Sequence, residues 1–227
     1  MQNGAADKTG FLYRNSLSLV LFAVFGLALV GQLLTGWRAL AAELKLDGLA
    51  PPSLGSYITT GHFISAVFEN WESEFLQMAA YVLLTIFLRQ KGSPESKAVC
   101  GEEDEDADPQ TARADARAPW PVRRGRVVRW LYASSLSLAL GLLFAASFAL
   151  HLAGSTRLAN EEAMRRGQPP VTYAQHLAEP QFWYESFQNW QSEFFAMGMF
   201  IVLGVYLRQR GSPQSKPVAT PHDQTSS

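Results

Sequence analysis

The chain has 227 residues, a formal net charge of -1 at pH 7 and one cysteine. A single cysteine excludes an intramolecular disulfide and any metal site built from several cysteines. The balanced charge gives no reason to expect a nucleic-acid partner. The mean hydropathy of -0.02 is that of a soluble protein, but the apolar residues are gathered in four blocks with the charged residues between them. The hydropathy of a sliding window is the better guide, and it predicts an integral membrane protein.

The first apolar block, residues 15–37, contains no charged residue. Its 23 residues make a helix about 34 Å long, enough to cross a hydrocarbon core of about 30 Å. A secretory signal peptide is the alternative, because residues 39–41 (ALA) resemble a cleavage site. The block is too long for the apolar part of a signal peptide, and its pattern returns deep inside the chain. We therefore expect a membrane span over about 15–37.

The second apolar block is short, with 14 residues at 75–88. That is about 21 Å of helix, so a full span must reach back through the preceding polar motif to Asn70. Gly92 and Pro94 stop the helix. The sequence predicts a span over about 70–89, preceded by a short interfacial helix within 57–71.

The middle and the end of the chain are polar. Residues 99–122 contain an acidic run and too few apolar residues to fold, so we expect a disordered linker. Two further apolar blocks predict spans over about 130–153 and 189–208. Residues 217–227 are expected to form a disordered tail.

The two halves of the chain are copies of one sequence, offset by 119 residues. From Phe68 to Lys97 the copies match at 16 of 30 positions without a gap. Each half holds two predicted spans, so both halves insert in the same orientation. The expected fold is all-α, with four transmembrane helices in two parallel helical-hairpin repeats, residues 1–98 and 123–216.

Lysine and arginine set the orientation of these spans. The loops between paired spans hold five of the 19 basic residues, and the two termini with the central linker hold the other 14. The positive-inside rule therefore places both termini and the linker in the cytoplasm. The expected partners are the lipid bilayer and, because four spans make a thin wall for a transport path, further copies of the chain in a homo-oligomer.

The repeated motif predicts a polar layer in the outer half of the bundle. Asn70, Glu74 and Gln77 share one helical face, which must face the bundle interior or water rather than lipid. The candidate site consists of Glu74, Glu193, Asn70, Asn189, Gln32 and His151, with Trp71 and Trp190 as interface anchors. Glu72 lies on another side of its helix and becomes Gln191 in the second copy, so the candidate site excludes it.

Three interpretations of this layer remain open. The favoured one is structural, in a membrane- or envelope-associated protein whose motif satisfies helix N-termini. In the second, the Glu74–Glu193 pair binds a cation, a proton or a small polar solute on a transport path. In the third, one of these glutamates is the acid–base group of an enzyme, assisted by His151. We expect no enzyme, no cofactor and no metal site, since His151 and two glutamates are suitable ligands but lack a local ligand spacing.

Two motifs occur in both halves, Asn-Trp-x-Ser-Glu-Phe and Arg-Gln-Lys/Arg-Gly-Ser-Pro-x-Ser-Lys. Together with residues 11–18 (FLYRNSLS) they resemble an uncharacterised family of small bacterial integral membrane proteins, a domain of unknown function. The resemblance covers nearly the whole chain apart from residues 99–121 and the tails. It implies the bacterial cytoplasmic (inner) membrane, and it implies no activity, cofactor or site residue.

Overall fold

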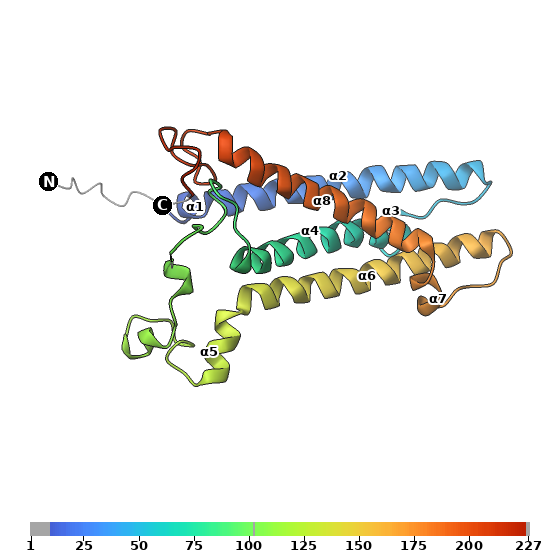
Figure 1. Ribbon diagram of the computed structural model, residues 1–227. Helices are drawn as coiled ribbons and strands as arrows, with labels where there is room; N and C mark the ends of the chain where they lie inside the picture. Colours follow the sequence, from blue (N-terminus) through green and yellow to red (C-terminus); the bar gives the residue numbers. More distant parts are fainter. Residues whose placement is uncertain (1–9, 102, 226–227) are drawn as a thin grey trace.

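Figure 1 shows the computed structural model, which describes residues 10–101 and 103–225. The expected polar N-terminus before residue 10, linker residue 102 and the last two tail residues lie outside the described residues. The helices are α1 (Phe11–Arg14), α2 (Ser16–Leu46), α3 (Leu54–Tyr57), α4 (Gly61–Phe87), α5 (Arg126–Ala133), α6 (Ser135–Arg165), α7 (Tyr173–Leu177) and α8 (Pro180–Tyr206), with 3-10 helices η1 (Asp104–Asp106) and η2 (Thr111–Ala114) in the linker. The described residues contain no strand, which confirms the all-α class.

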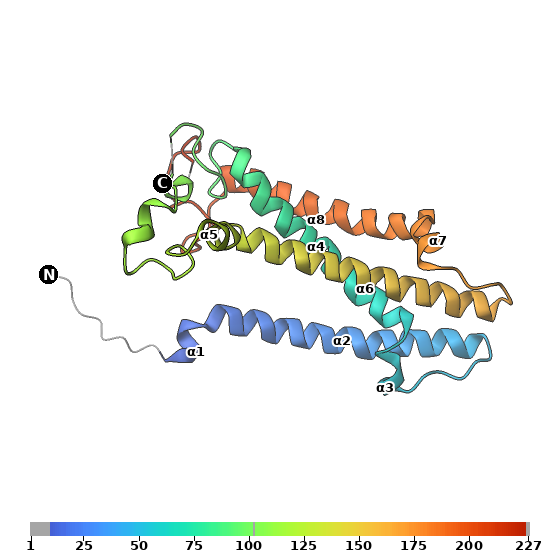
Figure 2. The same ribbon diagram turned by 90° about the horizontal axis from the view of Figure 1, so that it is seen from below.

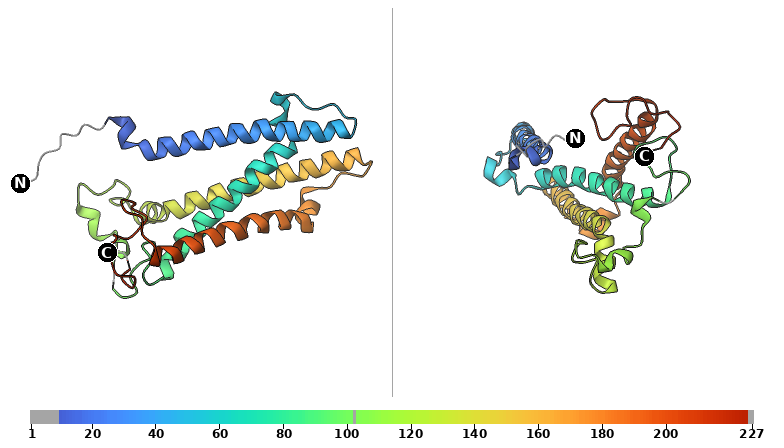
Figure 3. Two further views of the ribbon diagram at one scale, coloured as in Figure 1. Left: turned by 90° about the horizontal axis from the view of Figure 1, so that it is seen from above. Right: turned by 90° about the vertical axis from the view of Figure 1, so that its left-hand side faces the viewer.

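The long helices α2, α4, α6 and α8 run alternately in opposite directions (Figures 1 and 2). The linker and the end of the described chain lie at the same end of the bundle as α1. The bounds of α6 and α8 are those of α2 and α4 plus 119, since 16 + 119 = 135 and 61 + 119 = 180. Seen end-on, α4 crosses the middle of the bundle, with α6 below it and with α2 and α8 above it at the left and at the right (Figure 3).

The second and fourth long helices begin nine residues before Asn70 and Asn189 (70 − 61 = 9 and 189 − 180 = 9). The side chain of Thr60 caps the first of them by accepting a hydrogen bond from the backbone N–H of Phe63 at 3.3 Å. Pro180 occupies the first turn of the other, where a missing N–H costs nothing. The prediction of a separate interfacial helix within 57–71 is wrong, because α4 begins at Gly61 and continues unbroken past residue 71.

By length and composition, two helices of the described chain could cross a membrane, α2 and α6. Both extend past their apolar blocks, through residues of high helix propensity such as alanine, leucine and glutamate. Helices α4 and α8 do not pass the same test, because the polar motif fills part of each. The four predicted spans are therefore supported in part.

The closest contact between long helices is the crossing of α4 over α6. A methyl group at Gly154 would lie 2.5 Å from the backbone nitrogen of Ser65, and one at Gly61 would overlap the backbone of Leu158. Glycine at both positions therefore lets the two backbones approach. At the offset of 119, the counterparts of Gly154, Gly61 and Ser65 are larger residues: Thr35 in α2, and Pro180 and Tyr184 in α8. Their bulk explains why α2 makes no comparable contact with α8.

The bundle is polar inside and apolar outside. Its buried side chains include Glu72, His151 and several serines, together with Tyr57 and Phe182. None of the apolar window of α2 is buried, and the exposed residues include many leucines, valines and phenylalanines. In water this distribution would be unfavourable, whereas it suits a bundle surrounded by lipid.

The repeated Gly-Ser-Pro motif forms the same turn after α4 and after α8. The backbone N–H of Gln90 donates to Ser96 Oγ at 2.8 Å, and that of Gln209 donates to Ser215 Oγ at 2.9 Å. After the second turn, the Lys216 ammonium donates to the backbone carbonyls of three tail residues, 221, 222 and 224. Where the sequence predicts a disordered tail, the structure shows residues 217–225 folded back in turns.

The glycine crossing yields the first prediction. Gly154→Ala should lower the free energy of unfolding by about 1–3 kcal/mol, because the new methyl group meets backbone that cannot move aside cheaply. Gly141→Ala in the same helix meets open space and should leave stability unchanged or slightly higher. Denaturant titration in mixed micelles measures both variants. Equal effects at the two positions would contradict the close crossing.

Candidate functional site

A buried contact between a carboxyl group and an imidazole joins α4 to α6. His151 Nδ1 lies 2.7 Å from Glu72 Oε2, and both side chains are 0 % exposed. The indole N–H of Trp190, on α8, donates to Glu72 Oε1 at 3.0 Å. Both carboxylate oxygens of Glu72 are therefore satisfied, and three helices meet at one side chain. This geometry corrects the exclusion of Glu72 from the site.

The helix crossing places this pair. Ser65 and Glu72 are seven residues apart, so they share one face of α4, and His151 and Gly154 are three apart on one face of α6. Because Gly154 meets Ser65, the next contact along the crossing brings Glu72 to His151. The pair is thus built by the same two faces that make the close approach.

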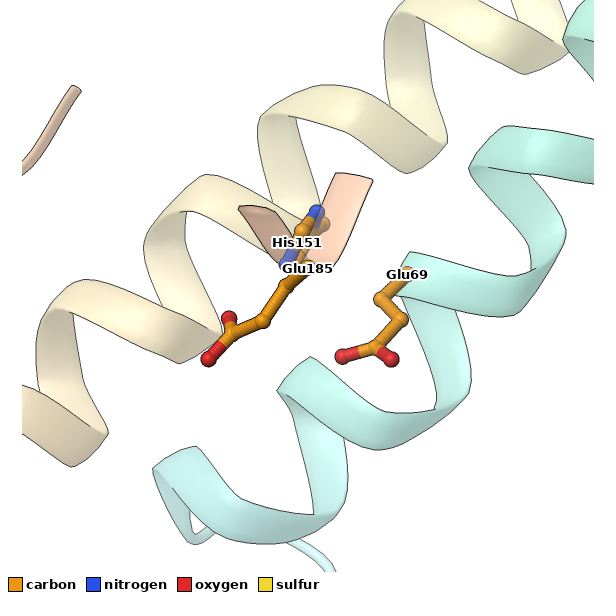
Figure 4. A group of neighbouring side chains, drawn as sticks. All are labelled: Glu69, His151 and Glu185. Atoms are coloured by element: carbon orange, nitrogen blue, oxygen red, sulfur yellow. The ribbon is translucent and has the colours of Figure 1, made fainter. Parts of the chain in front are cut away.

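Two further carboxyl groups lie close to the imidazole of His151. One ligand atom each of Glu69, His151 and Glu185 lie within 4.8 Å of one another (Figure 4). Nδ1 is engaged by Glu72, whereas Nε2 is buried and has no hydrogen-bond partner in the described part of the chain. The ring of Phe182 stacks on the imidazole at 4.8 Å between centroids and holds its plane.

Each carboxylate of the cluster is held by one amide. Asn189 Nδ2 donates to Glu69 Oε1 at 2.9 Å, and Gln181 Nε2 donates to Glu185 Oε1 at 2.7 Å. Neither Oε2 accepts a hydrogen bond from the residues that the structure describes. Every member of the cluster therefore has one atom fixed by a neighbour and one atom left for a ligand.

A hollow of about 610 Å³ lies against the cluster, between α4, α6, α7 and α8. We call it the outer vestibule, since it lies at the end of the bundle opposite the linker. Its ionisable lining residues are His62, Glu69, Glu162, Arg166, His176, Glu179 and Glu185. Four carboxylates against one guanidinium make the vestibule attractive to cations.

The predicted site residues fall into separate places. Of the six, His151 belongs to the cluster and Asn189 supports it. Glu74 and Glu193 lie on neighbouring helices, close enough to interact electrostatically, where Gln77 Nε2 donates to the Glu193 carbonyl at 3.3 Å. The amides of Asn70 and Gln32 both donate to the backbone carbonyl of residue 66, at 2.8 and 3.3 Å.

The two tryptophans have different surroundings. Trp71 packs against the rings of Phe25 and Phe68, with centroids 5.8 and 5.2 Å apart. Trp190 is the hydrogen-bond donor to Glu72 described above, so its indole N–H points into the bundle rather than toward a membrane interface.

The cluster has no ionisable equivalent at the positions that the repeat relates to it. Subtracting or adding 119 gives the uncharged counterparts Gln188 for Glu69, Gln191 for Glu72, Gln32 for His151 and Ala66 for Glu185. The sequence signal for this site is therefore an ionisable residue in one copy and an uncharged residue in the other. A prediction from residues that recur in both copies does not include such positions.

The family model described as Domain of unknown function (DUF6766) matches residues 8–227. No curated protein and no solved structure matches the chain. The family match confirms the resemblance to an uncharacterised family, and its description assigns no activity or site residue.

The buried pair yields the second prediction. Glu72→Gln and His151→Gln should each lower the free energy of unfolding by roughly 3 kcal/mol, because each leaves a buried group without its partner. The double variant reproduces the amides of the other copy and should lose less than the sum of the single losses. Unfolding titrations in mixed micelles measure the coupling. Glu74→Gln is the control for a glutamate on the same helix, and additive losses would show that the pair is not coupled.

Proposed function

Because the chain belongs to the family described as Domain of unknown function (DUF6766), which carries no activity, we propose its function from the site: a four-span membrane protein that binds a cation in its outer half and passes it across the membrane. The observation that carries the proposal is the fully buried Glu72–His151 pair beside an acidic vestibule. No chemical reaction is part of the proposal.

The four-span arrangement rests on length and on the distribution of polarity. Helices α4 and α8 have 27 residues each, which is about 40 Å and enough to span a membrane at a tilt. Within these motifs Glu72 and Ser73 are buried, so lipid need not solvate them, whereas Asn70, Glu74, Gln191 and Ser192 are exposed in the single chain. With the positive-inside rule, this supports insertion in the inner membrane with both termini cytoplasmic.

A purely structural role for the motif is less well supported. Its asparagines cannot cap helix N-termini, because α4 and α8 begin nine residues earlier (70 − 61 = 9). A buried ion pair is weak as a stabilising device, since desolvating two charges costs several kcal/mol. Ionisable groups inside a membrane bundle instead mark ion or proton paths by default.

A path across the bundle can be followed along α4. The vestibule reaches Glu69, and Glu74 with its neighbour Glu193 comes about 7.5 Å further along the helix. Beyond them, a groove of about 380 Å³ between α4 and α8 runs toward the linker end. Gln77, Tyr81 and Thr85 line it from α4. Glu74 therefore comes between the two hollows along α4, and the proposed path passes it.

Orientation is tested by cysteine labelling after Cys100→Ser. Cysteines at Ala50 and Gln168 should react with an impermeant thiol reagent added to intact spheroplasts. Cysteines at Asp108 and Gln224 should react only after the membrane is permeabilised. External labelling of Asp108→Cys would reverse the proposed topology.

Transport is tested with purified protein in liposomes carrying indicators for H⁺, K⁺, Ca²⁺ and Mn²⁺. The wild type should carry at least one cation faster than empty liposomes. Glu72→Gln should lower that flux at least tenfold, and the Glu74→Gln/Glu193→Gln double variant should lower it as well, because both remove charge from the path. Glu161→Gln, on the outer part of α6 and paired with Arg157, is the control and should keep the flux. Wild-type liposomes without flux, together with a Glu74→Gln/Glu193→Gln variant that melts near the wild-type temperature, would favour the structural interpretation.

A further inference from the structure

We infer that the cation is a divalent first-row transition metal ion, bound by His151 Nε2 and by one carboxylate oxygen each of Glu69 and Glu185. Glu72 is then a positioning residue, which acts on the ion through His151. The inference rests on the proposed function, because it names the class of ion that the same vestibule admits.

The donor atoms select the class of ion. Magnesium and calcium take oxygen ligands almost exclusively, whereas imidazole nitrogen is a preferred ligand of zinc, iron, cobalt, nickel and copper. A site that buries an imidazole at 0 % exposure beside two carboxylates therefore suits a transition metal. Three protein ligands also leave a coordination position open toward the vestibule for water or for exchange.

The surroundings of the three donors are those of a metal site. Metal-binding histidines almost always donate their second ring N–H to a carboxylate or carbonyl, which fixes the tautomer. Glu72 occupies this position, and its second oxygen is held by Trp190. Asn189 and Gln181 likewise orient Glu69 and Glu185. The buried Nε2 without a partner is the atom that an ion would satisfy.

The charges also favour a dication. Glu69, Glu72 and Glu185 bring three carboxyl groups to one imidazole. A cation placed among them meets more acidic than basic side chains, and the attraction is stronger for a dication than for a monovalent ion.

The donor atoms must move inward to bind an ion. Ligands at about 2.0–2.2 Å around a tetrahedral ion lie roughly 3.4 Å apart, and the present separations reach 4.8 Å. Glu69 and Glu185 are half-buried at the edge of the vestibule, so their side chains have room to swing. His151 is held by Glu72 and Phe182 and is the fixed member of the set.

The repeat gives independent support. Each of the four ionisable residues has an uncharged residue at its counterpart position. The counterparts of Glu69, Glu72 and His151 are glutamines, and that of Glu185 is alanine. The charged residues thus occur as a complete set in one place and are missing as a set from the other. A solvated charged surface would not require that agreement among four positions.

The test measures binding of ZnCl2, CoCl2, MgCl2 and CaCl2 to the purified full chain in nanodiscs by calorimetry, with the Co²⁺ visible spectrum as a structural readout. The wild type should bind one Zn²⁺ or Co²⁺ per chain, at least a hundredfold more tightly than Mg²⁺ or Ca²⁺. Glu185→Gln should weaken binding at least tenfold, and His151→Gln should also remove the imidazole signature from the Co²⁺ spectrum. Glu72→Gln should weaken binding 10–100-fold while the imidazole signature remains, an outcome that distinguishes positioning from ligation.

Glu161→Gln is the matched carboxylate control and should bind Zn²⁺ like the wild type. Because His151→Gln removes a buried partner and can prevent folding, the half-buried Glu185→Gln keeps the test decisive. Zn²⁺ binding that survives both variants, or that is lost instead in His176→Gln, overturns the inference. If the wild type carries another cation but binds no transition metal ion, this inference is wrong and the proposed function stands. If it neither binds nor carries any cation, both proposals are wrong.

Discussion

The close approach of α4 to α6 at Gly61 and Gly154 is the contact on which the rest of the structure depends. It brings two helix faces together along several turns, and the faces are polar rather than apolar. A buried carboxylate is tolerated only when its charge and its oxygens are matched, and the crossing supplies the imidazole while α8 supplies the indole. The vestibule is the space that remains where α8 diverges from this pair of helices.

The helical class, the order of the long helices and the unbroken course of α4 through the motif could be predicted from hydropathy and from the repeat. The residues at which α4 and α8 begin could not be predicted. The thickness of the hydrocarbon core sets only the minimum length of a span, and both helices are longer than this minimum. The true starts depend on local capping by Thr60 and on Pro180. These capping residues lie outside the stretch whose length is set by the thickness of the membrane.

Glu72 was missed for a geometrical reason. The helical-face argument assigns one interior face to each span, whereas α4 lies between α6 and α8 and has an interior face toward each. Glu72 faces α6, and Gln77 reaches α8. In a duplicated chain, residues that recur describe the shared scaffold, so the residues that fail to recur were the better guide to this site.

The duplication also has a consequence for stoichiometry. Glu69 and Glu72 come from the first half of the chain, and His151 and Glu185 come from the second. If two identical hairpins paired as separate molecules, each would carry the same residues. One could then not supply the glutamates of α4 while the other supplied the histidine of α6 and the glutamate of α8. The covalent connection through residues 99–122 breaks that symmetry, enforces one-to-one pairing and raises the effective concentration of each half for the other. The fused chain can therefore specialise one interface and leave α2 free to face lipid or another protein.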